Sequence, residues 1–117
     1  VKYFDEVFTD HIYGAISVIN AAKSSDEQND LQASISEWKQ NGDMIAMALY
    51  QMNEMFGTLS DIQKMMQKHL DLTIGEVIAL IKNQHTDIYI FEHIRDNIYG
   101  MASMMAFGTA RKIGIAI

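Results

Sequence analysis

The sequence predicts an all-α protein, an antiparallel up-and-down bundle of four helices. Three observations lead to this prediction. The 117 residues include no proline, and helix-favouring types such as Ala, Leu, Met, Gln, Lys and Glu are frequent. Apolar residues recur at steps of three and four in four separate stretches. The polar breaks between the stretches are short, which favours antiparallel neighbours, and the length suits one domain, residues 1–117.

The first helix is predicted over residues 2–23. Its apolar residues follow one stripe, and three isoleucines beside that stripe widen it into a broad apolar face. The stripe contains Phe4, Phe8, His11, Ala15, Val18 and Ala22, and the isoleucines are Ile12, Ile16 and Ile19.

The second helix has the most regular pattern. Its start is indicated by Ser24 with Glu27, or Ser25 with Gln28, because both pairs have the spacing of a capping box. Its end is indicated by Gly57. The inward positions form a seam of coiled-coil type in which Gly42 fills one place, and the others are Leu31, Ile35, Trp38, Ile45, Leu49, Met52 and Phe56.

The third helix is expected to begin after a capping Thr58 or Ser60 and to end near Asn83. Its stripe is unusual because polar side chains interrupt it. The inward positions are Ile62, Met66, His69, Thr73, Glu76 or Val77, and Leu80.

The fourth helix follows the polar break at residues 83–87 and is predicted to run to about Gly108. Its last turn is expected to contain Arg111 and Lys112, because cations are favourable at a helix C-terminus. Its inward positions are Ile90, Ile94, Asn97, Met101 and Met104.

Nine methionines lie on the later three helices, and we expect them to fill gaps in the core. The alternative is a soft-metal site in which Met and His bind copper. The nine are Met44, Met47, Met52, Met55, Met65, Met66, Met101, Met104 and Met105.

Composition excludes several classes of function. The net charge is −6 and the nine basic residues are scattered, so nucleic acid is not an expected partner. No apolar run is long enough for a membrane span. Without cysteine, there is no disulfide and no thiolate chemistry. The chain starts at Val1, so the compartment stays open between the cytoplasm and, if a signal peptide was removed, export.

Polar residues on the inward stripes are predicted to meet in one layer of the bundle. Counting from each turn places His11 near Trp38 and Asn41, Asn41 near Thr73, and Thr73 near Asn97. Buried polar groups without partners would cost about 1 to 3 kcal/mol each, so these groups should bond one another or a ligand. The candidate binding residues are His11, Trp38, Asn41, Asp43, His69, Thr73, Glu76 and Asn97.

Three functions follow from this layer. A structural or interaction role is favoured, because a satisfied polar layer fixes helix register as a buried Asn does in coiled coils. The alternative is a bundle that binds a small ligand or a transition metal through His11, His69 and Glu76, since histidine with carboxylate suits zinc, iron or manganese. Asp43 or Asp10 would be more distant ligands.

An enzyme is the least favoured of the three classes. The sequence has no phosphate-binding loop, nucleophile elbow or dinucleotide fingerprint. It also lacks the Glu-x-x-His and His-Glu-x-x-His patterns of helical metal enzymes. The hydroxyl of Thr73, one turn after His69, is expected to bond the backbone carbonyl behind it rather than to act as a nucleophile.

The motifs resemble those of a family of small, uncharacterised bacterial helical proteins. The family patterns are H-I-x-x-A, W-x-x-N-A-x-x-I-A and H-L-x-x-T-x-x-E. In this chain they correspond to His11-Ile12-x-x-Ala15, to Trp38-x-x-Asn41-Gly42-Asp43-x-Ile45-Ala46, and to His69-Leu70-x-x-Thr73-x-x-Glu76. The resemblance implies an all-helical fold and no established activity.

The resemblance also implies that this chain lacks a further N-terminal helical segment that members of the family carry. The apolar surface under that segment would then be covered in another way, and we expect self-association. Two departures bear on the site and the C-terminus. Asn97 stands where the family tends to have histidine, which weakens a metal site, and RKIGIAI replaces the family's Q-F-P ending.

Overall fold

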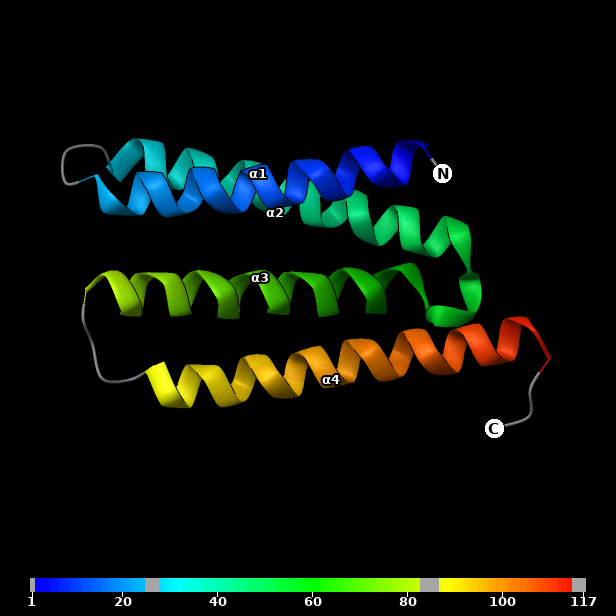
Figure 1. Ribbon diagram of the computed structural model, residues 1–117. Coiled ribbons are helices and arrows are strands. Elements are labelled where there is room, and N and C mark those ends of the chain that lie inside the picture. The colour runs from blue at the N-terminus through cyan, green and yellow to red at the C-terminus, as the bar shows by residue number, and fades with distance from the viewer. Residues whose placement is uncertain (1, 25–27, 83–86, 115–117) are drawn as a thin grey trace.

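The computed structural model describes residues 2–24, 28–82 and 87–114, and within them the chain is helical with no strand. The all-α fold with four antiparallel helices is therefore confirmed (Figure 1). The helices are α1 (Lys2–Lys23), α2 (Gln28–Met52), α3 (Leu59–Ile81) and α4 (Asp87–Lys112), with a short 3₁₀ helix, η1 (Glu54–Phe56), between α2 and α3.

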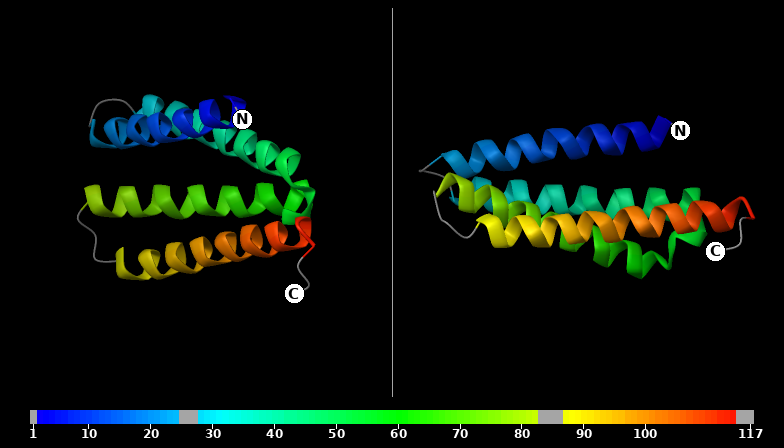
Figure 2. Two further views of the ribbon diagram at one scale, coloured as in Figure 1. Left: turned by 45° about the vertical axis from the view of Figure 1, so that its right-hand side comes forward. Right: turned by 60° about the horizontal axis from the view of Figure 1, so that its bottom comes forward.

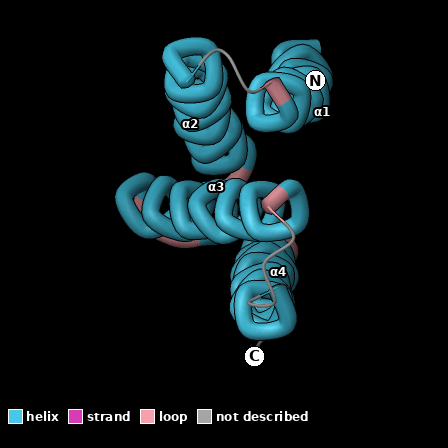
Figure 3. Tube along the Cα trace, turned by 90° about the vertical axis from the view of Figure 1, so that its left-hand side faces the viewer, coloured by secondary structure: helices cyan, strands magenta, loops and turns pink. Residues whose placement is uncertain are grey.

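Consecutive helices run in opposite directions, but the bundle is open on one side (Figures 1 and 2). Seen end-on in Figure 3, α1 and α2 lie side by side, α3 crosses beneath them, and α4 lies on the opposite face of α3. The main packing pairs are accordingly α1 with α2, α2 with α3, and α3 with α4. As a result, α1 and α4 do not form the close pair that would complete a four-helix ring.

The core consists of two apolar clusters, one toward each end of the bundle. His11 lies on α1 between Val7 of the first cluster and Val18 of the second, so a polar level separates the two. The first cluster contains Val7, Ile45, Ala46, Ala48, Leu49, Phe56, Ile62 and Met66, and the second contains Val18, Trp38, Leu70 and Ile74.

Two glycines let the helices approach closely at this level. A Cβ on Gly14 would lie 2.6 Å from Cδ1 of Trp38, and a Cβ on Gly42 would lie 2.6 Å from Cδ1 of Leu70. The first glycine brings α1 against α2, and the second brings α2 against α3. The seam position predicted for Gly42 is correct, and its large neighbour is Leu70 of α3.

The second helix ends earlier than the sequence predicted. Met52 is its last residue and is exposed, and Phe56 is buried from η1 instead. The cause is Asn53, whose Oδ1 accepts a hydrogen bond from the backbone N of Met55 at 2.9 Å and caps η1. Gly57, with φ of 151°, then permits the turn into α3.

The inward stripe of α3 also differs from the prediction. The described buried positions advance mainly in steps of four, and this row is inclined to the helix axis, as in helices that cross at an angle. Leu80 therefore points outward and is exposed. The cap at Thr58 is as predicted, because its Oγ1 accepts a bond from the backbone N of Asp61. The buried residues of α3 are Ile62, Met66, Leu70, Ile74 and Ala79.

The last helix and the methionines bring two more corrections. Helix α4 continues past Gly108 to Lys112, so Arg111 and Lys112 lie in its last turn as predicted, and Gly108 packs against Phe56. The core-filling role predicted for the methionines is wrong for five of the nine, since only Met66 is buried and three others are half-buried. The exposed five are Met44, Met47, Met52, Met55 and Met105.

Candidate functional site

The candidate site is the polar level between the two apolar clusters. Helix α1 contributes His11, α2 contributes Trp38 and Asn41, α3 contributes His69, and α4 contributes Asn97. Five of the eight residues predicted from the sequence therefore come together here, and each is buried or half-buried.

Three hydrogen bonds join α1 and α2 in one half of this level. His11 Nδ1 lies 3.0 Å from Asn41 Oδ1, and Asn41 Nδ2 donates to the backbone oxygen of Val7 at 2.9 Å. Trp38 Nε1 donates to the backbone oxygen of His11 at 2.9 Å. The rings of His11 and Trp38 stack with centroids 5.2 Å apart and an angle of 23° between their planes. Three side chains thus join the two helices at one level.

These contacts determine the tautomer of His11. A carbonyl oxygen can only accept, so the Asn41 group that faces the backbone oxygen of Val7 must be its NH₂. The Asn41 oxygen then faces His11, and the proton of the neutral imidazole must be on Nδ1. Nε2 of His11 is left as the acceptor of the ring.

The α3–α4 half of the level is not satisfied in the same way. The ring of His69 lies 6.4 Å from that of His11, centroid to centroid, with the planes tilted by 32°. Asn97 is only 6% exposed. Among the described residues, neither His69 Nδ1 nor Asn97 Oδ1 has a partner at hydrogen-bond geometry. This half therefore contains two buried polar groups, side by side, without a well-aligned hydrogen bond in the described part of the chain.

Both histidines are held toward the neutral form. Burial lowers the pKa of His11, and the hydrogen bond to Asn41 opposes this to a smaller extent. Burial also lowers the pKa of His69, and the nearby charge of a protonated His11 lowers it further. The neighbouring Asn97 side chain favours the protonated form of His69 and therefore raises its pKa, against the other two effects. Two neutral imidazoles therefore face one another at neutral pH.

The other three predicted residues lie outside this level. The ion pair of Lys39 with Asp71, at 2.7 Å, and the bond from Gln67 Nε2 to Asp43, at 2.8 Å, show the register of α2 on α3. That register places His69, not Thr73, level with Asn41. The prediction for Thr73 was wrong by one turn, and Asp43 is exposed on another face of α2.

Thr73 and Glu76 continue the polar stripe of α3 away from the level. The Thr73 hydroxyl donates to the backbone oxygen of His69 at 2.7 Å, as the sequence predicted. Glu76 lies two turns beyond His69, and its Oε2 is buried without a partner among the described residues. The stripe therefore contains a second unsatisfied acceptor.

The described residues contain no group of three or more His, Cys, Asp or Glu side chains placed to hold a metal ion. His11 and His69 approach one another, but Glu76 is not grouped with them. No described helix is long and apolar enough to cross a membrane.

Sequence reasoning missed one buried polar residue, Asn53. Besides capping η1, it donates from Nδ2 to the backbone oxygen of Gly108 at 3.0 Å, and so ties α4 to the turn after α2. The only signal in the sequence is an asparagine shortly before Gly57, which is a common turn composition and does not indicate a tertiary contact.

Comparison of the chain with models of protein families, with curated proteins and with solved structures finds no match. The resemblance to the bacterial helical family therefore stays a prediction.

Proposed function

We propose that this chain is a structural or interaction protein whose polar level fixes the arrangement of its helices and which acts as a self-associated assembly. The satisfied network of His11, Trp38 and Asn41 carries the first part of the proposal. If α1 slid along α2 by one turn, the bond between His11 and Asn41 would break, whereas the Trp38 and Asn41 donors would meet the equivalent backbone carbonyl one turn away. A buried polar group left without its partner costs about 1 to 3 kcal/mol, so the bond between His11 and Asn41 favours one register.

The amount of exposed surface supports self-association. A monomer of 13.3 kDa is expected to expose about 6,450 Å² from the usual scaling of surface with mass. This chain exposes 7712 Å². Its radius of gyration is 15.8 Å, compared with about 13.4 Å for a compact domain of this length. The surplus includes many large apolar side chains on α1, α2 and α4, and a partner copy would cover part of it.

Sedimentation velocity on the untagged chain from 1 to 100 μM tests this part of the proposal. A dimer or larger species that dissociates on dilution is the expected result. A single species of 13.3 kDa at every concentration would refute self-association.

A second candidate function is the binding of a small polar ligand or a metal ion through His11, His69 and Glu76. The unpartnered atoms His69 Nδ1, Glu76 Oε2 and Asn97 Oδ1 favour it, because buried polar atoms usually have a partner. Asn97 Oδ1, and Glu76 Oε2 when the carboxyl is ionised, can only accept hydrogen bonds. A ligand with several N–H or O–H donors, or a cation, would therefore suit them.

Elemental analysis of protein purified without chelators, beside a His69→Ala variant, tests the metal form of this candidate. Stoichiometric zinc, iron, manganese or copper that is lost in the variant would support it. A metal-free wild type, after loading with each ion in turn, would leave only an organic ligand or water for these atoms.

A further inference from the structure

Helix α1 carries a second apolar stripe beside the face that packs on α2. The stripe consists of Phe8, Ile12 and Ile16, which are spaced by four residues and so lie on one side of the helix. Their exposed fractions are 39%, 62% and 47%. Half-buried Ile19 continues the stripe toward the C-terminal end of α1. A helix that is apolar over so wide an arc normally contacts a neighbour on each part of it.

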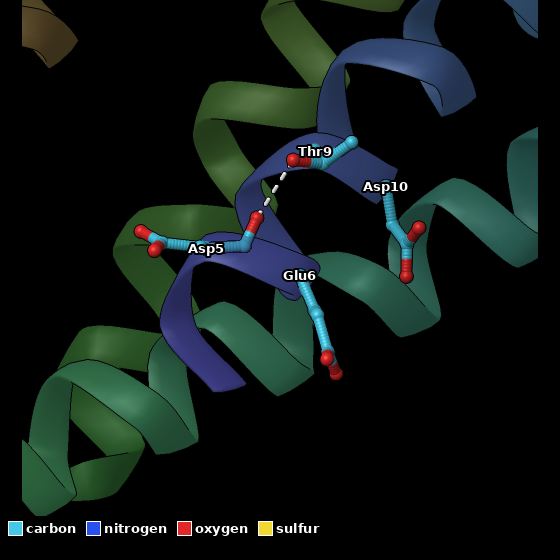
Figure 4. Close-up of a pocket in the computed structure, with 4 residues that line it drawn as sticks. All are labelled: Asp5, Glu6, Thr9 and Asp10. Atoms are coloured by element: carbon cyan, nitrogen blue, oxygen red, sulfur yellow. Dashed lines mark hydrogen bonds between the residues drawn. The ribbon is translucent and has the colours of Figure 1, made fainter. Parts of the chain in front are cut away.

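Two opposite charges stand at the ends of this stripe. In an α-helix each residue is rotated about the axis by about 100° from the one before it. Asp5 and Lys23 therefore project in the same direction from α1, and this direction lies between those of Ile12 and Ile16. Both are exposed, and neither has an ion-pair partner among the described residues. Figure 4 shows the Asp5 carboxylate on one side of α1 and those of Glu6 and Asp10 on the other, with the Thr9 hydroxyl bonded to the backbone of Asp5.

We propose that a second copy of the chain covers the stripe, with the two α1 helices packed antiparallel about a two-fold axis at the level of Gly14. This inference rests on the proposed self-association and specifies its interface. The axis places Ile12 opposite the partner's Ile16, and Asp5 opposite the partner's Lys23. Both contacts occur twice, as two-fold symmetry requires. A parallel pair would instead bring like charges together at both ends of the stripe.

The surface area suits such an interface. A stable dimer commonly buries about 800 Å² on each partner. The surplus surface of the whole chain over a compact monomer is about 1,250 Å², which exceeds that area. An anionic membrane surface suits the stripe less well, because the chain has a net charge of −6.

Neighbouring residues on α1 provide a matched pair of variants. Ile12 and Tyr13 are exposed to similar extents, 62% and 66%, but Tyr13 lies about 100° further round the helix, outside the stripe. Ile12→Lys should weaken dimerisation at least 100-fold in sedimentation velocity, because two ammonium groups would enter the apolar contact. Tyr13→Lys carries the same charge and should keep the wild-type dissociation constant. Circular dichroism should show equal helix content in both variants.

A charge exchange tests the antiparallel orientation without touching an apolar side chain. Asp5→Lys and Lys23→Asp should each weaken the dimer about ten-fold, since each replaces two attractive contacts with two repulsive ones. The double variant Asp5→Lys, Lys23→Asp should recover the wild-type affinity. Raising the salt concentration should reduce the effect of each single change.

The outcomes separate this inference from the proposal on which it rests. A wild-type chain that is monomeric at 100 μM overturns both. A wild-type dimer that Ile12→Lys leaves intact overturns only the α1 interface, and self-association then uses another face. Single charge variants that weaken the dimer without rescue in the double variant overturn the antiparallel arrangement.

Discussion

Replacing Asn41 by leucine tests whether the polar level holds the helices in place. The change removes two hydrogen bonds, to His11 Nδ1 at 3.0 Å and to the backbone oxygen of Val7 at 2.9 Å. Each bond contributes about 1 kcal/mol, and the Nδ1 proton of His11 is left half-buried without a partner. We therefore expect Asn41→Leu to lower the free energy of unfolding by about 2 to 3 kcal/mol.

For 117 residues the unfolding entropy is about 0.25 kcal/mol/K, so the midpoint of thermal unfolding should fall by about 8 to 12 °C. Urea unfolding followed by circular dichroism would give the free energy directly. All variants must be compared at one protein concentration, because dissociation of an assembly also changes the apparent stability. Asn20→Leu, at an exposed position of α1, is the matched control and should stay within about 0.5 kcal/mol of wild type.

The pairwise contribution comes from a double-mutant cycle with His11→Leu. Because His11 and Asn41 bond each other, the double variant should lose less than the two single losses combined, with a coupling of about 1 to 2 kcal/mol. A coupling below about 0.5 kcal/mol, together with a loss below 1 kcal/mol in Asn41→Leu, would show that the network does not hold α1 on α2.

Four other predictions concern two glycines, the two half-buried histidines and Asn53. Gly42→Ala should cost about 1 to 3 kcal/mol in urea unfolding, since its Cβ would lie 2.6 Å from Leu70 Cδ1. Gly100→Ala, which meets only the flexible end of Met65 at 3.2 Å, should be neutral or stabilising by up to about 1 kcal/mol. Because burial lowers the folded-state pKa of His11 and His69, the unfolded chain takes up their protons first, so stability should be full above about pH 6.5 and fall as the pH is lowered toward 5. The urea midpoint of His69→Gln should show less of this fall, and an equal fall would contradict the role of His69. Asn53→Ala should lose the bond to Gly108 and the η1 cap, at about 1 to 3 kcal/mol by thermal unfolding, and an unchanged midpoint would show that neither matters.

Local patterns in the sequence were sufficient to predict the helices. The first predicted helix, residues 2–23, has the observed bounds of α1, and the cap at Thr58 is present. Periodicity and capping act within a few residues, so a single sequence contains the information they need. One error lies at the end of α2, where Asn53 caps η1, and another is Leu80, which periodicity placed inward but which is exposed.

The candidate site was predicted less well along α3. Counting residues from the turns placed Thr73 beside Asn41, but an unforeseen 3₁₀ helix occupies the connection and changes the count by one turn. The contacts of α1 with α2 were predicted more accurately, because the connection between those helices is short. The error is confined to α3, where His69 takes the place expected for Thr73, because Asn97 of α4 lies at the polar level as predicted.

The open side of the bundle links the unexplained features of the chain. Apolar periodicity shows which faces of a helix avoid water, but it does not show whether the covering neighbour belongs to the same chain. The four predicted seams were assigned to one closed bundle for that reason. In the structure α4 lies beyond α3, and the second stripe of α1 stays only partly covered within the described chain, with Phe8, Ile12 and Ile16 exposed at 39%, 62% and 47%. The buried polar atoms of α3 and α4 that lack a hydrogen-bond partner among the described residues belong to the same open bundle. A second copy packed on α1 would supply the missing neighbour, whereas a rearrangement of α4 onto α1 would have to break its contacts with Asn53 and Phe56.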